Sequence, residues 1–253
     1  MVDMHIHSRC SEDSEAPMDS YAARADILGI DSICFTDHLD CNPHGYGYRY
    51  FVPEDYWREF NAASELNGRV QLLSGLEFGD PQMFPVEFNE LNAQPFDFIL
   101  GSVHFTERYP DLFFSELIKT GVTAVECYDT YWATVLECVS FGGFDCLGHL
   151  DFPKRYYNEL IYDEAKLRAI FHVMHENGII LEINASTLLR LGATMPCREL
   201  LQLYSAEGGR YAVFGSDAHR VEDLGVGYAE SKALLDECGI TEVMFVKRKM
   251  IVL

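Results

Sequence analysis

The chain has 253 residues, of which 48% are hydrophobic and 13% aromatic, so it can bury a substantial core and is not a disordered protein. It carries 40 acidic and 19 basic residues, and the formal net charge of −21 disfavours binding to nucleic acid polymers or anionic membranes. The 8 cysteines form no C-x-x-C pair, a pattern typical of free thiols in a reducing cytoplasm. Without a recognisable signal peptide or membrane-spanning run, the sequence predicts a cytoplasmic protein with one domain over residues 1–253.

Short strand-like runs alternate with longer helix-like runs along the whole chain. Strands are predicted where β-branched or aromatic residues form short runs, and helices where apolar residues recur at helical spacing and end at glycine. The predicted elements, in chain order, are strand 2–6, helix 20–29, strand 31–37, helix 54–68, strand 70–78, strand 96–105, helix 121–143, strand 144–152, helix 163–178, strand 179–186, helix 197–209, strand 211–219, helix 231–239 and a final β run 242–253.

This alternation of strands and helices predicts an α/β fold with a parallel sheet. About seven such units in a chain of this length favour a closed or distorted barrel. An open doubly wound sheet is the alternative, but the glycine-rich phosphate turn that usually follows its first strand is absent from this sequence.

Side chains that can bind metal ions occur at the C-terminal end of nearly every predicted strand. Six of the 9 histidines lie there, together with two carboxylates: His5, His7, His38, His104, His149, His219, Glu77 and Asp217. In a parallel barrel these strand ends meet at one mouth, where such folds carry out chemistry. Imidazole and carboxylate ligands without thiolates suit Zn, Mn or Fe(II), and the two oxygens of Glu77 could bridge two ions.

Taken together, these motifs resemble the PHP (polymerase and histidinol phosphatase) superfamily, and within it the histidinol-phosphate phosphatases. The motifs are H-x-H at His5–His7, T-D-H at Asp37–His38, G-x-E at Glu77, S-V-H at His104, G-H-x-D at His149–Asp151, L-E-I-N at Glu182–Asn184 and G-S-D-A-H at Asp217–His219. The resemblance covers nearly the whole chain. It implies a distorted (β/α)7 TIM-like barrel, the PHP fold, that holds two or three divalent transition metals (Zn, Mn or Fe).

The resemblance also implies how the donor residues divide among three ions. The implied ligands are His5, His7, Glu77 and Asp217 for the first ion, Glu77, His104 and His149 for the second, and His38 and His219 for the third. Some family members supply a further histidine to the third ion, and at that place this chain has Asp13, whose carboxylate could serve instead. Asp3, Asp37, Glu182 and Asn184 are interpreted as outer groups that orient the imidazoles.

The implied reaction is hydrolysis of a small phosphate monoester, foremost histidinol phosphate in histidine biosynthesis. A hydroxide bridging the first two ions would attack phosphorus, with Glu77, Asp217 and His219 as the predicted catalytic residues. Arg155 and Arg190 are predicted to bind the phosphate, because a guanidinium matches pairs of phosphate oxygens, with Lys154 as a weaker option. The proton for the leaving group could come from Asp151, Asp13, His219 or a metal-bound water, and the sequence does not choose among them.

Several alternatives stay open. The substrate could be another small phosphate, such as a nucleotide or a sugar phosphate. A metal-dependent amidohydrolase is less favoured, because strand 96–105 lacks the bridging lysine that this class often uses. A metal-bound regulatory module without activity is the third alternative. The acidic and aromatic loop 40–51 could receive a cationic leaving group or be an ordinary lid, and the sequence does not reveal the oligomeric state.

Overall fold

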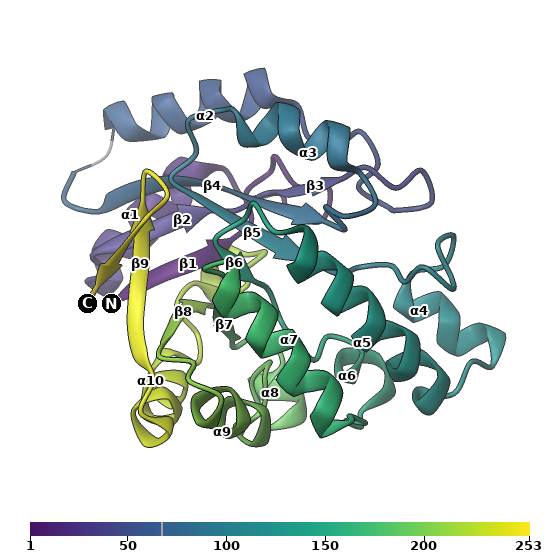
Figure 1. Ribbon diagram of the computed structural model, residues 1–253. Coiled ribbons are helices and arrows are strands. Elements are labelled where there is room, and N and C mark those ends of the chain that lie inside the picture. The colour runs from purple at the N-terminus through teal and green to yellow at the C-terminus, as the bar shows by residue number, and fades with distance from the viewer. Residues whose placement is uncertain (67) are drawn as a thin grey trace.

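The computed structural model describes residues 1–66 and 68–253, with strands at the centre and helices outside them (Figure 1). The strands are β1 (Val2–Ile6), β2 (Ser32–Phe35), β3 (His38–Asp40), β4 (Gln71–Gly79), β5 (Phe98–Ser102), β6 (Cys146–Leu147), β7 (Ile180–Asn184), β8 (Tyr211–Gly215), β9 (Thr241–Val246) and β10 (Lys249–Val252). The helices are α1 (Met18–Leu28), α2 (Pro53–Leu66), α3 (Pro85–Asn92), α4 (Phe114–Leu117), α5 (Ala124–Phe141), α6 (Lys154–Tyr157), α7 (Glu164–Glu176), α8 (Leu188–Leu191), α9 (Arg198–Ala206) and α10 (Tyr228–Cys238), with 3-10 turns at Ile118–Thr120 and Val221–Asp223.

The parallel strands follow one another in the order β1, β2, β4, β5, β6, β7 and β8. β3 continues the position of β2, because β2 pairs with the first half of β4 and β3 with the second half. β1 and β8 meet through a single bridge between Ile6 and Ala218, supported by a 2.8 Å hydrogen bond from Asp217 N to His5 O. The described chain therefore has the predicted distorted (β/α)7 fold, and the ladder between β8 and β1 is interrupted, so the sheet is not fully closed.

The inner face of the barrel changes from apolar to polar along the strands. Alternate residues of a strand share a face, so Leu73 and Glu77 of β4 lie on the same face, as do Ile180 and Glu182 of β7. The apolar layer at the start of the strands consists of Val2, Met4, Cys34, Leu73, Phe98, Leu100, Cys146, Ile180, Val213, Val243 and Phe245. This packed layer closes one end of the barrel and leaves the C-terminal strand ends for polar side chains.

The helices have sequence-encoded starts and cover the outside of the sheet. α5 begins at Ala124 because Thr123 Oγ1 accepts the amide of Glu126 while the Glu126 carboxylate accepts the amide of Thr123. α7 follows Asp163, whose Oδ1 accepts the amides of Ala165 and Lys166. Figure 1 shows α5 and α7 side by side along the sheet. None of the helices in the described ranges combines the length and apolarity that a membrane crossing requires.

The final β run differs from its prediction. Residues 242–253 were expected to form one run, but β9 and β10 form an antiparallel hairpin. Its turn residues Lys247 and Arg248 are left-handed, with φ of 52° and 60°, and neither is the glycine or asparagine that usually marks such a turn. Arg248 anchors the hairpin, donating to Asp145 Oδ2 at 2.5 Å, Asn92 Oδ1 at 2.6 Å and Gly143 O at 2.8 Å.

Two other segments also depart from the predicted pattern. The run 144–152 was predicted as a strand, yet only Cys146–Leu147 pairs with its neighbours. The rest turns across the barrel mouth and carries His149, whose φ is 24°. Helix α3 was not predicted, because its eight residues are too few for a clear helical period.

Candidate metal centre

The structure brings the nine predicted donor residues together at the mouth of the barrel. Four donor clusters contain side-chain atoms that all lie within 4.8 Å of one another: His5, His7 and Glu77; Glu77, His104 and His149; His7, Asp13, His38 and His219; and His38, Asp40 and His104. Asp217 adjoins the first cluster, with Oδ1 3.3 Å from His7 Nε2. The grouping follows the three predicted ligand sets closely, while the ligand role of each residue stays a prediction.

His5 and His7 point their Nε2 atoms at one another across 2.9 Å. Glu77 Oε2 lies 3.1 Å from His5 Nε2, and Asp217 Oδ1 lies 3.6 Å from the same atom. All four side chains are buried. Two imidazole nitrogens and two carboxylates that face one small volume form the arrangement expected around a divalent ion.

Glu77 stands between two of the donor clusters. Its Oε1 is 2.8 Å from His149 Nε2 and 3.4 Å from His104 Nε2, whereas Oε2 faces His5 and lies 3.1 Å from His38 Nδ1. Burial alone would raise the pKa of Glu77, but the charges of His38 and His5 hold it well below its usual range. The carboxylate is therefore ionised, and each oxygen is available to a different cluster.

Asp13 completes the cluster at the outer edge of the mouth. Its Oδ2 is 2.8 Å from His219 Nε2 and 3.7 Å from His38 Nε2. The rings of His7 and His219 stack with centroids 4.1 Å apart. An aspartate oxygen thus occupies the place at which a further histidine was expected from some family members, and three imidazoles surround it.

The protonation of the rings differs sharply across the centre. Burial, reinforced by the charges of His219 and His38, lowers the pKa of His7 to about 3, so this ring is neutral. Burial would also lower the pKa of His219, but the hydrogen bond to Asp13 and the charge of Asp217 raise it to about 9. The carboxylates are thus balanced by protons, which a divalent ion would replace.

Outer groups fix the orientation of the imidazoles. Glu182 Oε1 lies 2.5 Å from His5 Nδ1, so the opposite ring nitrogen is directed at the centre. Ser11 Oγ lies 3.1 Å from His7 Nδ1 and donates to Asp37 Oδ1 at 2.9 Å. The predicted orienting roles of Glu182 and Asp37 therefore have contacts to support them, the latter through Ser11, a residue that sequence reasoning missed.

The other two predicted orienting residues act on different partners. Asp3 Oδ1 accepts the backbone amide of Ser216 at 3.0 Å, so it holds the chain around the site rather than a ring. Asn184 donates to Asp217 Oδ2 at 3.3 Å and so contacts a carboxylate rather than an imidazole.

Asp40, the acidic residue of loop 40–51, makes a contact at the site that the sequence analysis did not predict. Its Oδ1 lies 3.2 Å from His104 Nδ1, and this contact directs His104 Nε2 towards Glu77. Gly79 permits the approach, because a Cβ at that position would collide with Asp40 Oδ1. The sequence could have indicated this position, because side chains alternate between the two faces of a strand and Asp40, two residues after His38 in β3, lies on the same face as His38.

The predicted phosphate-binding residues occupy different surroundings. Arg155 Nη2 donates to Asp217 Oδ2 at 2.7 Å and Ser186 Oγ at 2.6 Å, and the guanidinium lies 5.0 Å from the centre of the Phe152 ring. Arg190 is exposed and donates to the carbonyl of Arg155, outside the lining of the mouth cavity. Arg155 is thus at the centre, while direct phosphate contact by Arg190 stays a prediction.

Lys154 and Asp151 pair with each other outside the lining of the mouth cavity. Lys154 is buried and donates to Asp151 Oδ2 at 2.6 Å and to Thr194 O at 2.7 Å. Neither side chain lines the mouth cavity. Their pairing ties α6 to the loop before α9, which is a structural role.

The mouth cavity above the donor clusters has a volume of about 240 Å³. Its floor contains predicted donors and Arg155, and its walls carry the aromatic residues Tyr46, Phe105, Phe113, Phe152 and Tyr156. Tyr46 and Phe113 face each other across 6.2 Å between ring centres. The cavity therefore joins a polar floor to an apolar rim, which suits a molecule with a charged end and an organic end.

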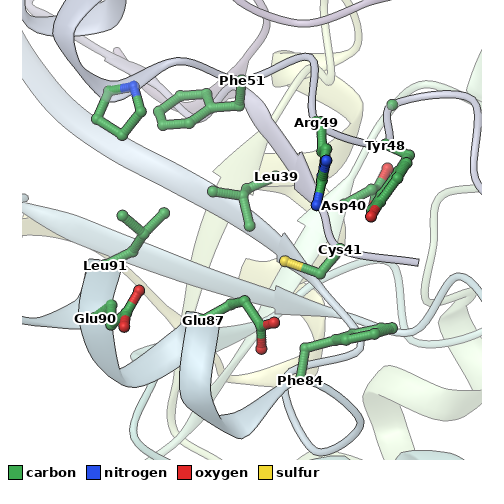
Figure 2. Close-up of a pocket in the computed structure, with 12 residues that line it drawn as sticks. Leu39, Asp40, Cys41, Tyr48, Arg49, Phe51, Phe84, Glu87, Glu90 and Leu91 are labelled. Carbon is green, nitrogen blue, oxygen red and sulfur yellow. The ribbon is translucent and has the colours of Figure 1, made fainter. Parts of the chain in front are cut away.

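A second cavity of about 360 Å³ lies beside β3 and α3 (Figure 2). Figure 2 shows Asp40 at its edge, near Tyr48 and Arg49. Asp40 also lines the mouth cavity, but the other residues of the second cavity belong to none of the four donor clusters. Its greater size therefore does not make it the place where the chemistry occurs.

Comparison with known proteins agrees with this geometry. A family model described as PHP domain matches residues 3–186, and the chain belongs to this family. A crystal structure of histidinol phosphate phosphatase from Lactococcus lactis, complexed with zinc, L-histidinol and phosphate, superposes with a TM-score of 0.86 and 26% identity over 99% of this chain and 98% of that one. The predicted family and fold are confirmed.

Curated relatives point the same way. A probable histidinol-phosphatase of Clostridium acetobutylicum is 26% identical over 99% of this chain and 98% of its own length. The histidinol-phosphatase of Lactococcus lactis is 28% identical over 96% and 93%, respectively. A probable phosphatase of Vibrio vulnificus is 28% identical over 94% of this chain and 85% of its own.

Proposed function

We propose that this protein is a metal-dependent phosphatase that hydrolyses histidinol phosphate, a step in histidine biosynthesis. One observation carries the proposal: Glu77 presents its two oxygens to two separate donor clusters beneath a cavity with one arginine in its floor. The names of the full-length relatives support the choice of substrate.

The donor atoms fit divalent metals. The Nε2 atoms of His5 and His7 face each other, while Glu182 contacts Nδ1 of His5 and Ser11 contacts Nδ1 of His7. Contacts of this kind fix the ring orientation and so preorganise metal ligands. We propose that two or three ions of Zn, Mn or Fe bind there. Such ions, when bound, supply Lewis-acid activation of water and stabilise charge on a phosphoryl group.

The protein's own side chains would bind and orient the substrate. Arg155 has donors beyond the Nη2 group that contacts Asp217, and these can bind two phosphate oxygens. Asp217 in turn fixes the guanidinium, which is stacked on Phe152. Glu77, Asp217 and His219 would act as catalytic residues by holding the charged centre in place, and the aromatic rim would exclude water from the organic part of the substrate.

The proposal extends to the organisation of the chain. We propose that residues 1–253 form one domain, because the inner apolar layer joins Val2 of β1 to Val243 and Phe245 of β9. A small substrate suits the net charge of −21, which would repel a nucleic acid polymer. The eight free cysteines support a cytoplasmic location.

A second candidate is a phosphatase of another small monoester. The resemblance to a protein named only as a probable phosphatase favours keeping this alternative. The two candidates share the metal centre and differ in the organic group that fits the cavity rim.

Phosphate release from a panel of monoesters tests the proposal. The panel contains histidinol phosphate, a sugar phosphate, a nucleoside monophosphate and 4-nitrophenyl phosphate, assayed before chelation, after chelation and after reloading with Zn, Mn or Fe. We expect two or three ions per chain and a kcat/KM for histidinol phosphate about 100-fold above the other esters. Activity that survives complete chelation would contradict the metal requirement, and preference for another ester would favour the second candidate.

A further inference from the structure

Glu12 is an acidic side chain in the mouth cavity that the metal centre leaves unused. It lines the cavity but belongs to none of the four donor clusters. Its Oε2 is buried and has no hydrogen-bond partner within residues 1–66 and 68–253. A buried carboxylate oxygen without a partner is costly, so its retention calls for a partner that the chain does not supply.

The neighbouring acidic groups are already paired. Asp13 lies 2.8 Å from His219 Nε2, and Asp40 lies 3.2 Å from His104 Nδ1. Arg155, the arginine of the cavity lining, is engaged by Asp217 at 2.7 Å. His38, which lines the same cavity, offers Glu12 a positive charge, but no hydrogen bond within the described residues engages Glu12 Oε2, so the carboxylate can attract a further cation.

The surroundings of Glu12 suit an organic cation rather than a metal ion. No described histidine or carboxylate joins Glu12 in a cluster of ligand atoms. The same cavity is walled by Tyr46, Phe105 and Phe113, whose rings accept apolar groups and the faces of cations. An ammonium group on a short carbon chain matches this combination.

We propose that Glu12 binds the ammonium group of the substrate and so selects phosphate monoesters of amino alcohols. The inference rests on the proposed phosphatase function and adds a specificity residue to it. The phosphate lies over the donor clusters and Arg155, and the ammonium pairs with Glu12 at the cavity wall. The imidazole of histidinol, largely neutral above pH 7, does not provide the required charge.

Gly47 of the loop 42–50 packs directly against the Glu12 carboxylate. A Cβ at Gly47 would lie 2.7 Å from both carboxylate oxygens, so the glycine lets the loop 42–50 pack directly against Glu12. Gly47 has no positive φ, which means that alanine can adopt its backbone conformation. Gly47→Ala would therefore displace the carboxylate without straining the loop.

The test compares Glu12→Gln with the matched control Glu15→Gln, which alters an exposed glutamate three residues away. Both variants are assayed at pH 8 on histidinol phosphate and on N-acetylhistidinol phosphate, which lacks the ammonium charge. We expect Glu12→Gln to lower kcat/KM for histidinol phosphate about 30- to 100-fold, mainly through KM, and to leave the acetylated ester within about twofold. Gly47→Ala should act in the same direction but more weakly, and Glu15→Gln should change neither ester.

Calorimetric binding of L-histidinol separates this inference from the proposed function. We expect Glu12→Gln to weaken L-histidinol binding and to keep the metal content of the wild type. Equal losses on both esters, or no loss on either, would overturn the role of Glu12. If the wild type released no phosphate from any ester while still binding L-histidinol through Glu12, the phosphatase proposal alone would fail. L-histidinol binding that is independent of Glu12 would overturn the inference whatever the activity.

Discussion

Glu182 and His5 are 177 residues apart in the chain, yet Glu182 Oε1 lies 2.5 Å from His5 Nδ1. This contact holds the ring so that Nε2 faces His7 and Glu77, and Glu182 Oε2 also accepts the amide of His149 at 2.7 Å. A Cβ at Gly215 of β8 would collide with Glu182 Oε1, which shows how closely β7 and β8 approach each other at this point. One buried carboxylate thus sets the geometry of two predicted ligands, one on β1 and one in the turn after β6.

Glu182→Gln should weaken metal binding without unfolding the protein. The amide keeps the shape of the side chain but loses the charge that orients and polarises His5, so we expect metal affinity to fall about 10- to 100-fold. Competition with a chromogenic chelator measures the affinity, and Glu230→Gln on the exposed face of α10 is the matched control. Unchanged affinity would mean that Glu182 has only a packing role.

Glu77→Gln should have a larger effect. Glu77 is close to His5, His38 and His149, so an uncharged side chain there would disturb two donor clusters at once. We expect phosphatase activity to fall by about 1000-fold or more, with loss of bound metal detected by elemental analysis. A fully active variant with normal metal content would remove Glu77 from the centre, and circular dichroism checks that the fold is retained.

Metal binding should strengthen as the pH rises towards 9. The pKa of His219 is raised to about 9 in the protein without ions, so below that pH an incoming ion must displace a proton from the ring. We expect affinity for the ion at this cluster to rise roughly tenfold per pH unit between pH 7 and 9 and to level off above. Isothermal titration in buffers of different ionisation enthalpy measures the released proton.

Asp13→Asn provides the control for this pH dependence. Asp13 is the main group that raises the pKa of His219. Without its charge His219 should lose the proton at lower pH, so the pH dependence should shift to lower pH as the overall affinity falls. A slope that is identical in both proteins would show that His219 does not exchange its proton for the ion.

Arg155→Lys should impair substrate binding although it keeps the charge. A lysine cannot contact Asp217 and Ser186 and still offer paired donors to a phosphate. We expect kcat/KM to fall about 10- to 100-fold with unchanged metal content. Arg168→Lys, on the exposed side of α7, is the control. A parallel Arg190→Lys variant asks whether the exposed arginine contributes at all.

Arg248→Ala should lower stability but not the activity of the folded enzyme. Arg248 ties the C-terminal hairpin to Asp145, Asn92 and Gly143, and its removal leaves the largely buried Asp145 carboxylate without its cation. We expect a loss of about 2–4 kcal/mol in the free energy of unfolding, measured with urea. Lys249→Ala, at an exposed position of β10, should change it by less than about 0.5 kcal/mol.

The barrel and the gathering of the donors could be predicted from the sequence because both depend on local, repeated signals. Most of the parallel strands are short apolar runs with a polar residue near or just after their C-terminal end, as in β4 with Glu77 or β7 with Glu182. Parallel topology then brings those ends together. The family resemblance assigned Asp13 to the outer cluster, where the structure places it beside His219. Its role as a ligand stays a prediction.

The features that were missed depend on tertiary contacts whose local signal in the sequence is weak or absent. Asp40 became recognisable only when the pairing of β3 with β4 set it against His104. The turn at Lys247–Arg248 lacks glycine. Arg248 adopts a left-handed conformation there, and its guanidinium donates hydrogen bonds to three groups that are distant in sequence. Glu12 appears in sequence as an ordinary loop acid, since only the fold reveals that its Oε2 is buried without a hydrogen-bond partner among the described residues.

The stacking of His7 on His219 brings together a segment before α1 and a segment after β8. During synthesis His7 leaves the ribosome well before His219, which follows β8. The outer donor cluster therefore cannot be assembled before His219 has emerged, and until then ions cannot promote folding by binding the complete cluster. In the cell, loading of this cluster with metal would thus require synthesis through β8 and His219, and a chain that stops before β8 would remain without it.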